Sequence, residues 1–136
     1  MRPPADARVT LGDVKHLTHD EAAGNAQPGD LTHFTGLVTQ VPVHTTTEAQ
    51  PVRVLLVGFQ EGARTHWHSH AGGQVLHIVD GRGRTQVRGQ PTVEMGPGDL
   101  VSVPPGEEHW HGAAEGEAMT HLAISIGSTD WGDPPD

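Results

Sequence analysis

The sequence has no cysteine, and lysine occurs only once, at Lys15. The absence of cysteine excludes disulfides, thiolate metal sites and cysteine nucleophiles. Positive charge is scarce, since 8 Lys and Arg stand against 17 Asp and Glu and give a formal net charge of −9. Such a chain has no basic patch to neutralise phosphates, so we expect neither nucleic acid nor an anionic membrane as a partner.

Long apolar runs are missing as well. The longest, residues 54–59, is far too short to span a bilayer, and the first ten residues lack the apolar segment of a secretory signal. We therefore expect a cytoplasmic protein. The length of 136 residues fits one domain with one hydrophobic core.

Glycine (18) and proline (11) are frequent, which argues against long helices. Alternating β-rich segments between turn signals instead predict strands at 34–44, 52–59, 66–70, 74–80, 85–88, 92–95, 100–103, 109–114 and 118–126. The Gly-Arg-Gly sequence at 81–83 predicts a hairpin. We expect an all-β antiparallel barrel or sandwich at 34–126, with an N-terminal arm at 1–33 and a loose acidic C-terminal tail at 127–136.

Histidine is unusually common, with 11 residues. Several recur at a spacing of two, which places His66, His68 and His70 on one strand face and His109 and His111 on another. Burying an unpaired imidazole costs about 1–3 kcal/mol, whereas one divalent cation can satisfy several imidazoles at once. These rows therefore predict a metal site.

The spacing of these histidines and of nearby glycines gives two strings of residues. The members of the first, separated by 5, 1, 3 and 6 residues, are Gly62, His68, His70, Gln74 and Gly81. The members of the second, separated by 5, 1 and 2 residues, are Gly98, Pro104, Gly106 and His109. The two strings resemble the two motifs of the cupin superfamily. Gln74 departs from the family's usual glutamate, and Ala113 departs from its frequent asparagine.

This resemblance implies a double-stranded β-helix, which is a jelly-roll barrel, around one divalent metal ion held by His68, His70, Gln74 and His109. Manganese is the first expectation for the metal, and iron, nickel, zinc and cobalt also suit such ligands. Because all four ligands are neutral, the ion keeps its full charge and acts as a strong Lewis acid, which favours lyase or isomerase chemistry over oxygen activation. Small cupins often form dimers or tetramers, so we expect a homodimer or homotetramer in which the arm at 1–33 is a candidate for exchange.

A narrower likeness lies in the sequences GARTHWHSHAGGQ (62–74) and PGEEHWHGAAEGEAMTHLAI (105–124). These resemble the bacterial cupin hydroxynitrile lyases, which hold manganese with three histidines and a glutamine. The resemblance implies that His121, His111 and Thr65 are catalytic, with His121 as the base. The expected reaction cleaves a cyanohydrin, a small-molecule substrate, to an aldehyde and hydrogen cyanide. The expected role of His111 is to donate a hydrogen bond to departing cyanide.

Two other functions remain open at this stage. The first is an iron-dependent dioxygenase on the same barrel, and the second is a non-catalytic module that binds a metal or a small ligand.

Several residues also have structural alternatives. Gln74 can simply bond across strands, and His121 can be a structural histidine. Strand parity places Thr65 opposite His68, so that Thr65 reaches the pocket only through a β-bulge. We expect Trp67 and Trp110 to pack between the sheets. We expect Val54, Leu56 and Phe59 to lie in the core.

Overall fold

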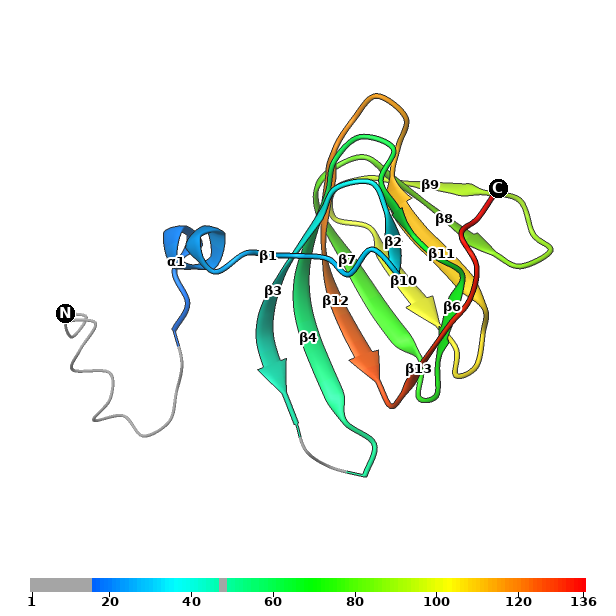
Figure 1. Ribbon diagram of the computed structural model, residues 1–136, viewed down its shortest axis with the longest axis horizontal. Helices are drawn as coiled ribbons and strands as arrows, with labels where there is room; N and C mark the ends of the chain where they lie inside the picture. The colour runs from blue at the N-terminus through cyan, green and yellow to red at the C-terminus, as the bar shows by residue number, and fades with distance from the viewer. Residues whose placement is uncertain (1–15, 47–48) are drawn as a thin grey trace.

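A computed structural model describes residues 16–46 and 49–136 and consists of two antiparallel β-sheets that face each other (Figure 1). In order across the first sheet, the strands are β1 (Gln27–Pro28), β3 (Val38–Thr45), β4 (Val52–Phe59), β12 (Met119–Ile126), β7 (Gln74–Gly81) and β10 (Leu100–Val103). The strands of the second sheet are β13 (Thr129–Trp131), β6 (His68–His70), β11 (His109–Ala113), β5 (Arg64–Thr65) and β2 (Phe34–Thr35), with β8 (Gly83–Val87) paired to β11 and β9 (Val93–Met95) paired to β8. This arrangement confirms the expected all-β jelly-roll barrel.

The core forms where period-two strands turn their apolar faces inward. Along β12 every second residue is buried, from Met119 to Ser125, and the residues between them are half-buried. On β4 the buried residues are Val57 and Phe59, which pack against the inward residues of β7 and β12. Val54 and Leu56 alternate with these residues and are only half-buried, so the prediction that they belong to the core was wrong.

Trp67 and Trp110 also lie on the outer face of the second sheet rather than between the sheets. The guanidinium groups of Arg64 and Arg84 cover the ring of Trp110 at 5.3 and 5.4 Å, and Arg88 covers Trp67 at 4.1 Å. Strand parity gives the reason, because Trp110 lies between two inward-facing histidines of β11 and must therefore face outward.

The hairpin predicted at 81–83 does not form. β7 pairs with β12 and β10, whereas β8 pairs with β11 and β9, so the chain passes from one sheet to the other at Arg82. Gly81 permits this crossing, since its φ is +78° and a Cβ there would lie 2.0 Å from the carbonyl oxygen of Ala118. The glycines therefore mark a turn, but they do not determine which strands pair after it.

Short strands join both terminal regions of the described chain to the barrel, while α1 lies to one side of it (Figure 1). The described part of the N-terminal arm holds the helix α1 (His19–Gly24), with a capping box between Thr18 and Glu21, and its strand β1 pairs with β3. The rest of the predicted arm, residues 1–15, lies outside the described residues. The prediction of a loose tail was wrong, because β13 pairs with β6 and Arg64 donates to the carbonyl oxygen of Pro135 at 3.0 Å. Among the described residues, no helix is long and apolar enough to cross a membrane.

Candidate metal centre

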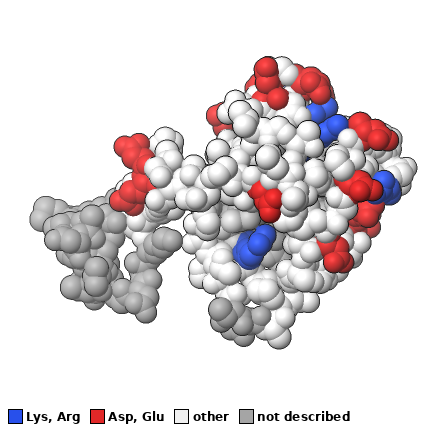
Figure 2. Space-filling view, in the orientation of Figure 1, with Lys and Arg blue, Asp and Glu red and all other residues white. Residues whose placement is uncertain are grey.

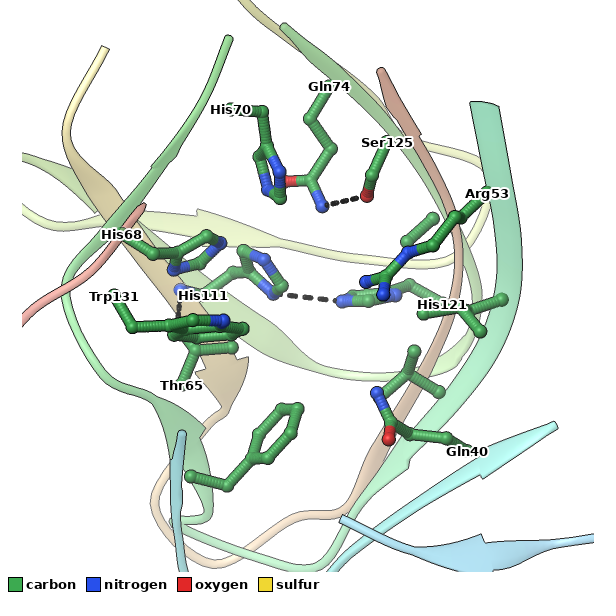
Figure 3. A pocket seen from close by; sticks show the side chains of 14 residues that line it. Gln40, Arg53, Thr65, His68, His70, Gln74, His111, His121, Ser125 and Trp131 are labelled. Atoms are coloured by element: carbon green, nitrogen blue, oxygen red, sulfur yellow. Dashed lines mark hydrogen bonds between the residues drawn. The ribbon is translucent and has the colours of Figure 1, made fainter. Parts of the chain in front are cut away.

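The two sheets bring the predicted site residues together inside one end of the barrel (Figure 3). His68 and His70 come from β6, and Gln74 comes from β7. His109 and His111 come from β11, and His121 comes from β12. All six side chains are buried, and His109 and His121 are 0% exposed. Strand register explains the convergence, since β11 pairs with β6 so that His109 lies directly opposite His68.

Hydrogen bonds fix which nitrogen of each predicted ligand carries the proton. His68 Nδ1 donates to the carbonyl oxygen of His66 at 2.8 Å, and His109 Nδ1 donates to that of Glu107 at 3.0 Å. A carbonyl oxygen only accepts, so in both neutral rings Nε2 bears the lone pair. His70 Nδ1 bonds the hydroxyl of Thr129 at 3.0 Å, and its buried Nε2 has no hydrogen-bond partner among the described residues. Nε2 is thus the nitrogen of each ring that can bind a metal.

Gln74 presents an oxygen to the same space. Its Nε2 donates to Ser125 Oγ at 2.9 Å, and this bond turns Oε1 toward His109 Nε2, 3.0 Å away. Since His109 is protonated on Nδ1, both atoms of this contact bear lone pairs and neither can donate. Two ligand atoms at right angles around one cation, each about 2.1 Å from it, are separated by about 3 Å. The Gln74–His109 contact therefore fits a shared divalent ion.

His111 lies closer to this group than the sequence indicated. One ring nitrogen from each of His68, His109 and His111 lies within 4.8 Å of the other two, so that these three residues could hold a metal ion, and this compact group does not include His70. The structure thus offers two candidate ligand sets that share His68 and His109. Of the two histidines that differ between these sets, the motif spacing selects His70 and not His111. Spacing along the chain carries no information on how β11 is shifted relative to β6 in the fold.

His111 and His121 form a hydrogen-bonded pair. The distance from His121 Nε2 to His111 Nδ1 is 2.9 Å, and the outer nitrogens, His111 Nε2 and His121 Nδ1, have no partner within the described part of the chain. Phe59 flanks both rings, with centroids at 6.0 and 5.1 Å. A proton can therefore move between two imidazoles in a site shielded from bulk water.

Thr65 also reaches the pocket. Its side chain is 1% exposed, and Oγ1 accepts a hydrogen bond from the backbone N–H of His111 at 3.2 Å. The parity argument against Thr65 assumed one continuous strand. The strand instead ends at Thr65, and a new one, β6, begins at His68. The break at residues 66–67 lets Thr65 and His68 face the same cavity.

Burial keeps these imidazoles neutral at physiological pH. It lowers the pKa of His68 to about 2, with a further contribution from the positive charge that His109 would carry. It likewise lowers the pKa of His70 and of His121 to about 4. The pKa of His109 and that of His111 are lowered for the same reason. Neutral rings are the form that binds metal, so no proton needs to be displaced.

The lowered pKa values predict that the metal-free protein is acid-labile. In the unfolded chain each histidine takes up a proton near pH 6.5, whereas in the fold His70 and His121 stay neutral down to about pH 4. Stability is therefore complete above about pH 6.5 and decreases as the pH falls toward the folded pKa values. At pH 5 each of these histidines costs about 2 kcal/mol. After chelation, we expect thermal denaturation followed by circular dichroism to give a Tm about 10 °C or more lower at pH 5 than at pH 7.5.

A control for this prediction is His77→Gln, because His77 is exposed on β7. This variant is expected to keep the pH dependence of the unmodified protein. An equal Tm at pH 5 and pH 7.5 for the metal-free protein would contradict the burial of neutral histidines.

The cavity in front of these residues is small, with a volume of about 30 Å³, enough for about two water molecules. Its wall also contains three residues that the sequence reasoning missed, namely Gln40, Arg53 and Trp131. Parity along β4 could have found Arg53, since it shares the inward face with Phe59. No sequence signal pointed to Trp131, whose ring lies 4.7 Å from that of His68 and 4.1 Å from that of His33.

The sequence is similar to a known family and to curated proteins. The family model of the cupin domain matches residues 55–125. A curated protein named (R)-mandelonitrile lyase, from Granulicella tundricola, is 46% identical over 96 residues, which cover 71% of this chain and 73% of that protein. A curated acireductone dioxygenase from Rhodopseudomonas palustris is 47% identical over 47 residues, covering 32% of this chain and 28% of that enzyme.

A solved structure is also similar over most of its length. The crystal structure of a cupin-like protein from Thermotoga maritima superposes with a TM-score of 0.75 and 39% sequence identity, covering 81% of this chain and 86% of that one. The barrel and the buried histidine cluster thus occur in a chain that is similar both to a lyase and, over a shorter stretch, to a dioxygenase.

Proposed function

The chain belongs to the cupin family, and from this premise we propose that it is a metal-dependent lyase that cleaves a cyanohydrin to an aldehyde and hydrogen cyanide. The observation that carries this proposal is the buried His111–His121 pair beside a cluster of neutral metal-ligating atoms. Such a pair can hold and return one proton, and the cleavage of a cyanohydrin requires the transfer of only one proton. The 46% identity to a mandelonitrile lyase supports the same choice.

The proposed metal ligands are His68, His70, Gln74 and His109. A divalent ion, manganese in this proposal, supplies a Lewis acid that lowers the pKa of a coordinated hydroxyl group. In both His70 and His111 one nitrogen is engaged, by Thr129 and by His121, and the buried Nε2 has no partner among the described residues. We prefer His70 as the ligand because the motif spacing selects it and because the bond from His111 to His121 suits proton transfer.

We assign the proton movements to the histidine pair. His111 Nε2 accepts the proton of the substrate hydroxyl while His111 Nδ1 passes its own proton to His121 Nε2, so that His121 is the final base. The electron pair of the O–H bond then forms the aldehyde carbonyl, and the carbon–cyanide bond breaks. Because burial lowers the pKa of His121 to about 4, it does not retain the proton, which returns through His111 Nε2 to cyanide.

Thr65 positions this pair in the proposal. Its Oγ1 accepts from the backbone N–H of His111, so its own O–H remains able to donate into the pocket. The expected role is to hold His111 in register with β5 and to hydrogen-bond the substrate oxygen.

Elemental analysis of the protein as purified, followed by mandelonitrile cleavage after reconstitution, tests this function. We expect one divalent ion per chain and release of benzaldehyde, seen by its ultraviolet absorbance, that depends on added manganese. Stoichiometric metal without turnover of any cyanohydrin would contradict the lyase and favour a non-catalytic module that binds a metal or small ligand.

An iron-dependent dioxygenase is the second candidate, favoured by the 47% identity to acireductone dioxygenase over 47 residues. The discriminating measurement is oxygen consumption by the iron-loaded protein with an enediol or β-diketone substrate. Oxygen uptake in the absence of cyanohydrin cleavage would favour this alternative.

A further inference from the structure

Among the described residues, Arg53 is the one Arg or Lys on the wall of the cavity. It lies on the inward face of β4, where it is paired in register with Ser125, the residue that holds Gln74. Figure 3 shows Arg53 extending from β4 toward the space between Ser125 and His121.

Arg53 lacks a negative partner in the described part of the chain. Ion pairs are formed there by His19, Arg84 and Arg88, but not by Arg53. The residues described around the cavity include no Asp or Glu, although the chain has 17 of them and Figure 2 shows acidic side chains spread over the surface. Arg53 is exposed, so water solvates its charge, but a cation without a carboxylate partner at the mouth of a neutral pocket is available to attract an anionic ligand.

The neutral side chains proposed as metal ligands add to this excess of positive charge. Three imidazoles and an amide cancel none of the charge of a divalent ion, and Arg53 adds one more positive charge beside it. A substrate that brings only a neutral hydroxyl group to the metal leaves the charge of Arg53 uncompensated.

The space around Arg53 shows where the anionic group belongs. The inner cavity of about 30 Å³ holds little more than the reacting atoms. A second space of about 400 Å³, the vestibule, adjoins it, and the two spaces share Phe34, Gln40, Arg53 and Trp131 as walls. A group that contacts Arg53 therefore lies on the body of the substrate, outside the reacting centre, where Phe34 and Trp131 offer carbon surface.

We propose that Arg53 selects substrates that carry a carboxylate on the part held in the vestibule, so that the preferred substrate is an anionic aryl cyanohydrin rather than mandelonitrile itself. This inference rests on the proposed function for its reaction but not for its binding step. Arg53 forms a charge-assisted hydrogen bond to the carboxylate, and Gln40, across the same opening, offers an amide donor.

The test compares the cyanohydrins of 3- and 4-formylbenzoate with mandelonitrile. With the metal-loaded protein, we expect kcat/KM to be about 10- to 100-fold higher for at least one carboxylate substrate, mainly through a lower KM. Arg53→Gln is expected to remove this preference, and the preference of the unmodified protein should shrink as the ionic strength rises. Arg82→Gln is the matched control, since Arg82 is exposed at the crossing between the sheets and its loss changes the net charge equally.

Two outcomes would overturn the proposal. One is an equal kcat/KM for charged and neutral cyanohydrins in the unmodified protein. The other is an equal loss of kcat for both in Arg53→Gln, which would place Arg53 at departing cyanide instead.

Binding separates this inference from the reaction. If no cyanohydrin is cleaved, the proposed function is wrong. Isothermal titration calorimetry with 4-formylbenzoate, 3-formylbenzoate and benzaldehyde then tests the anion site by itself. Tighter binding of at least one of them than of benzaldehyde, lost in Arg53→Gln and kept in Arg82→Gln, supports the anion site. Equal binding of the three compounds overturns it.

Discussion

His109→Ala is expected to lose its bound metal and, with it, the cleavage of cyanohydrins. His109 belongs to both candidate ligand sets, is 0% exposed, and directs its Nε2 at Gln74 Oε1 from 3.0 Å. Substitution of residues that only support a ligand typically lowers metal affinity by 10- to 100-fold, so loss of the ligand itself should exceed about 100-fold. The measurement is metal content after dialysis, together with the rate of benzaldehyde release.

The same measurement identifies the remaining histidine ligand. We expect His70→Ala to lose the metal and His111→Ala to keep it, with activity lost in both. His77→Ala controls for the removal of an imidazole, because His77 is exposed on β7. Circular dichroism establishes that each variant is folded. Retention of metal by folded His109→Ala would contradict the proposed site.

His121→Phe is expected to keep the metal but to lose the base, with kcat reduced by about 10²- to 10⁴-fold. Phenylalanine keeps an aromatic ring beside Phe59, whose ring centroid lies 5.1 Å away, but it is larger than histidine, so circular dichroism must first show that the variant is folded. The change removes both ring nitrogens, of which Nε2 bonds His111 and Nδ1 has no partner among the described residues. Steady-state kinetics with mandelonitrile, alongside elemental analysis, measures the effect.

The comparison variant for this change is His77→Phe, on the outer face of the same sheet. If His121→Phe turned over substrate at the unmodified rate, His121 would be a structural histidine, and His111 alone would have to handle the proton.

The sequence predicted the elements whose two faces differ in polarity. β4 runs from Val52 to Phe59, where the most apolar run of the sequence predicted a strand, and β12 buries every second residue. The cluster was predictable for a related reason, because pairs such as His68 and His70 share a strand face whatever the neighbouring strands are.

Features that depend on strand partners could not be predicted in this way. The partner of β8 is chosen by the packing of two sheets, which a local Gly-Arg-Gly signal does not encode. The strand at the C-terminal end is held by β6 and by Arg64, through contacts between residues distant in sequence. Likewise, the position of His111 depends on the depth of β11 relative to β6.

The sheet order has a consequence for synthesis of the chain. β12 lies between β4 and β7 in the first sheet, although it is the twelfth of the thirteen described strands in chain order. A ribosome must therefore translate most of the protein before β4, with its exposed backbone edge and apolar side chains, meets its central neighbour. During this interval the nascent chain is prone to intermolecular strand pairing. Uptake of the ion should accordingly follow release from the ribosome, once the late strand has joined the two halves of the sheet.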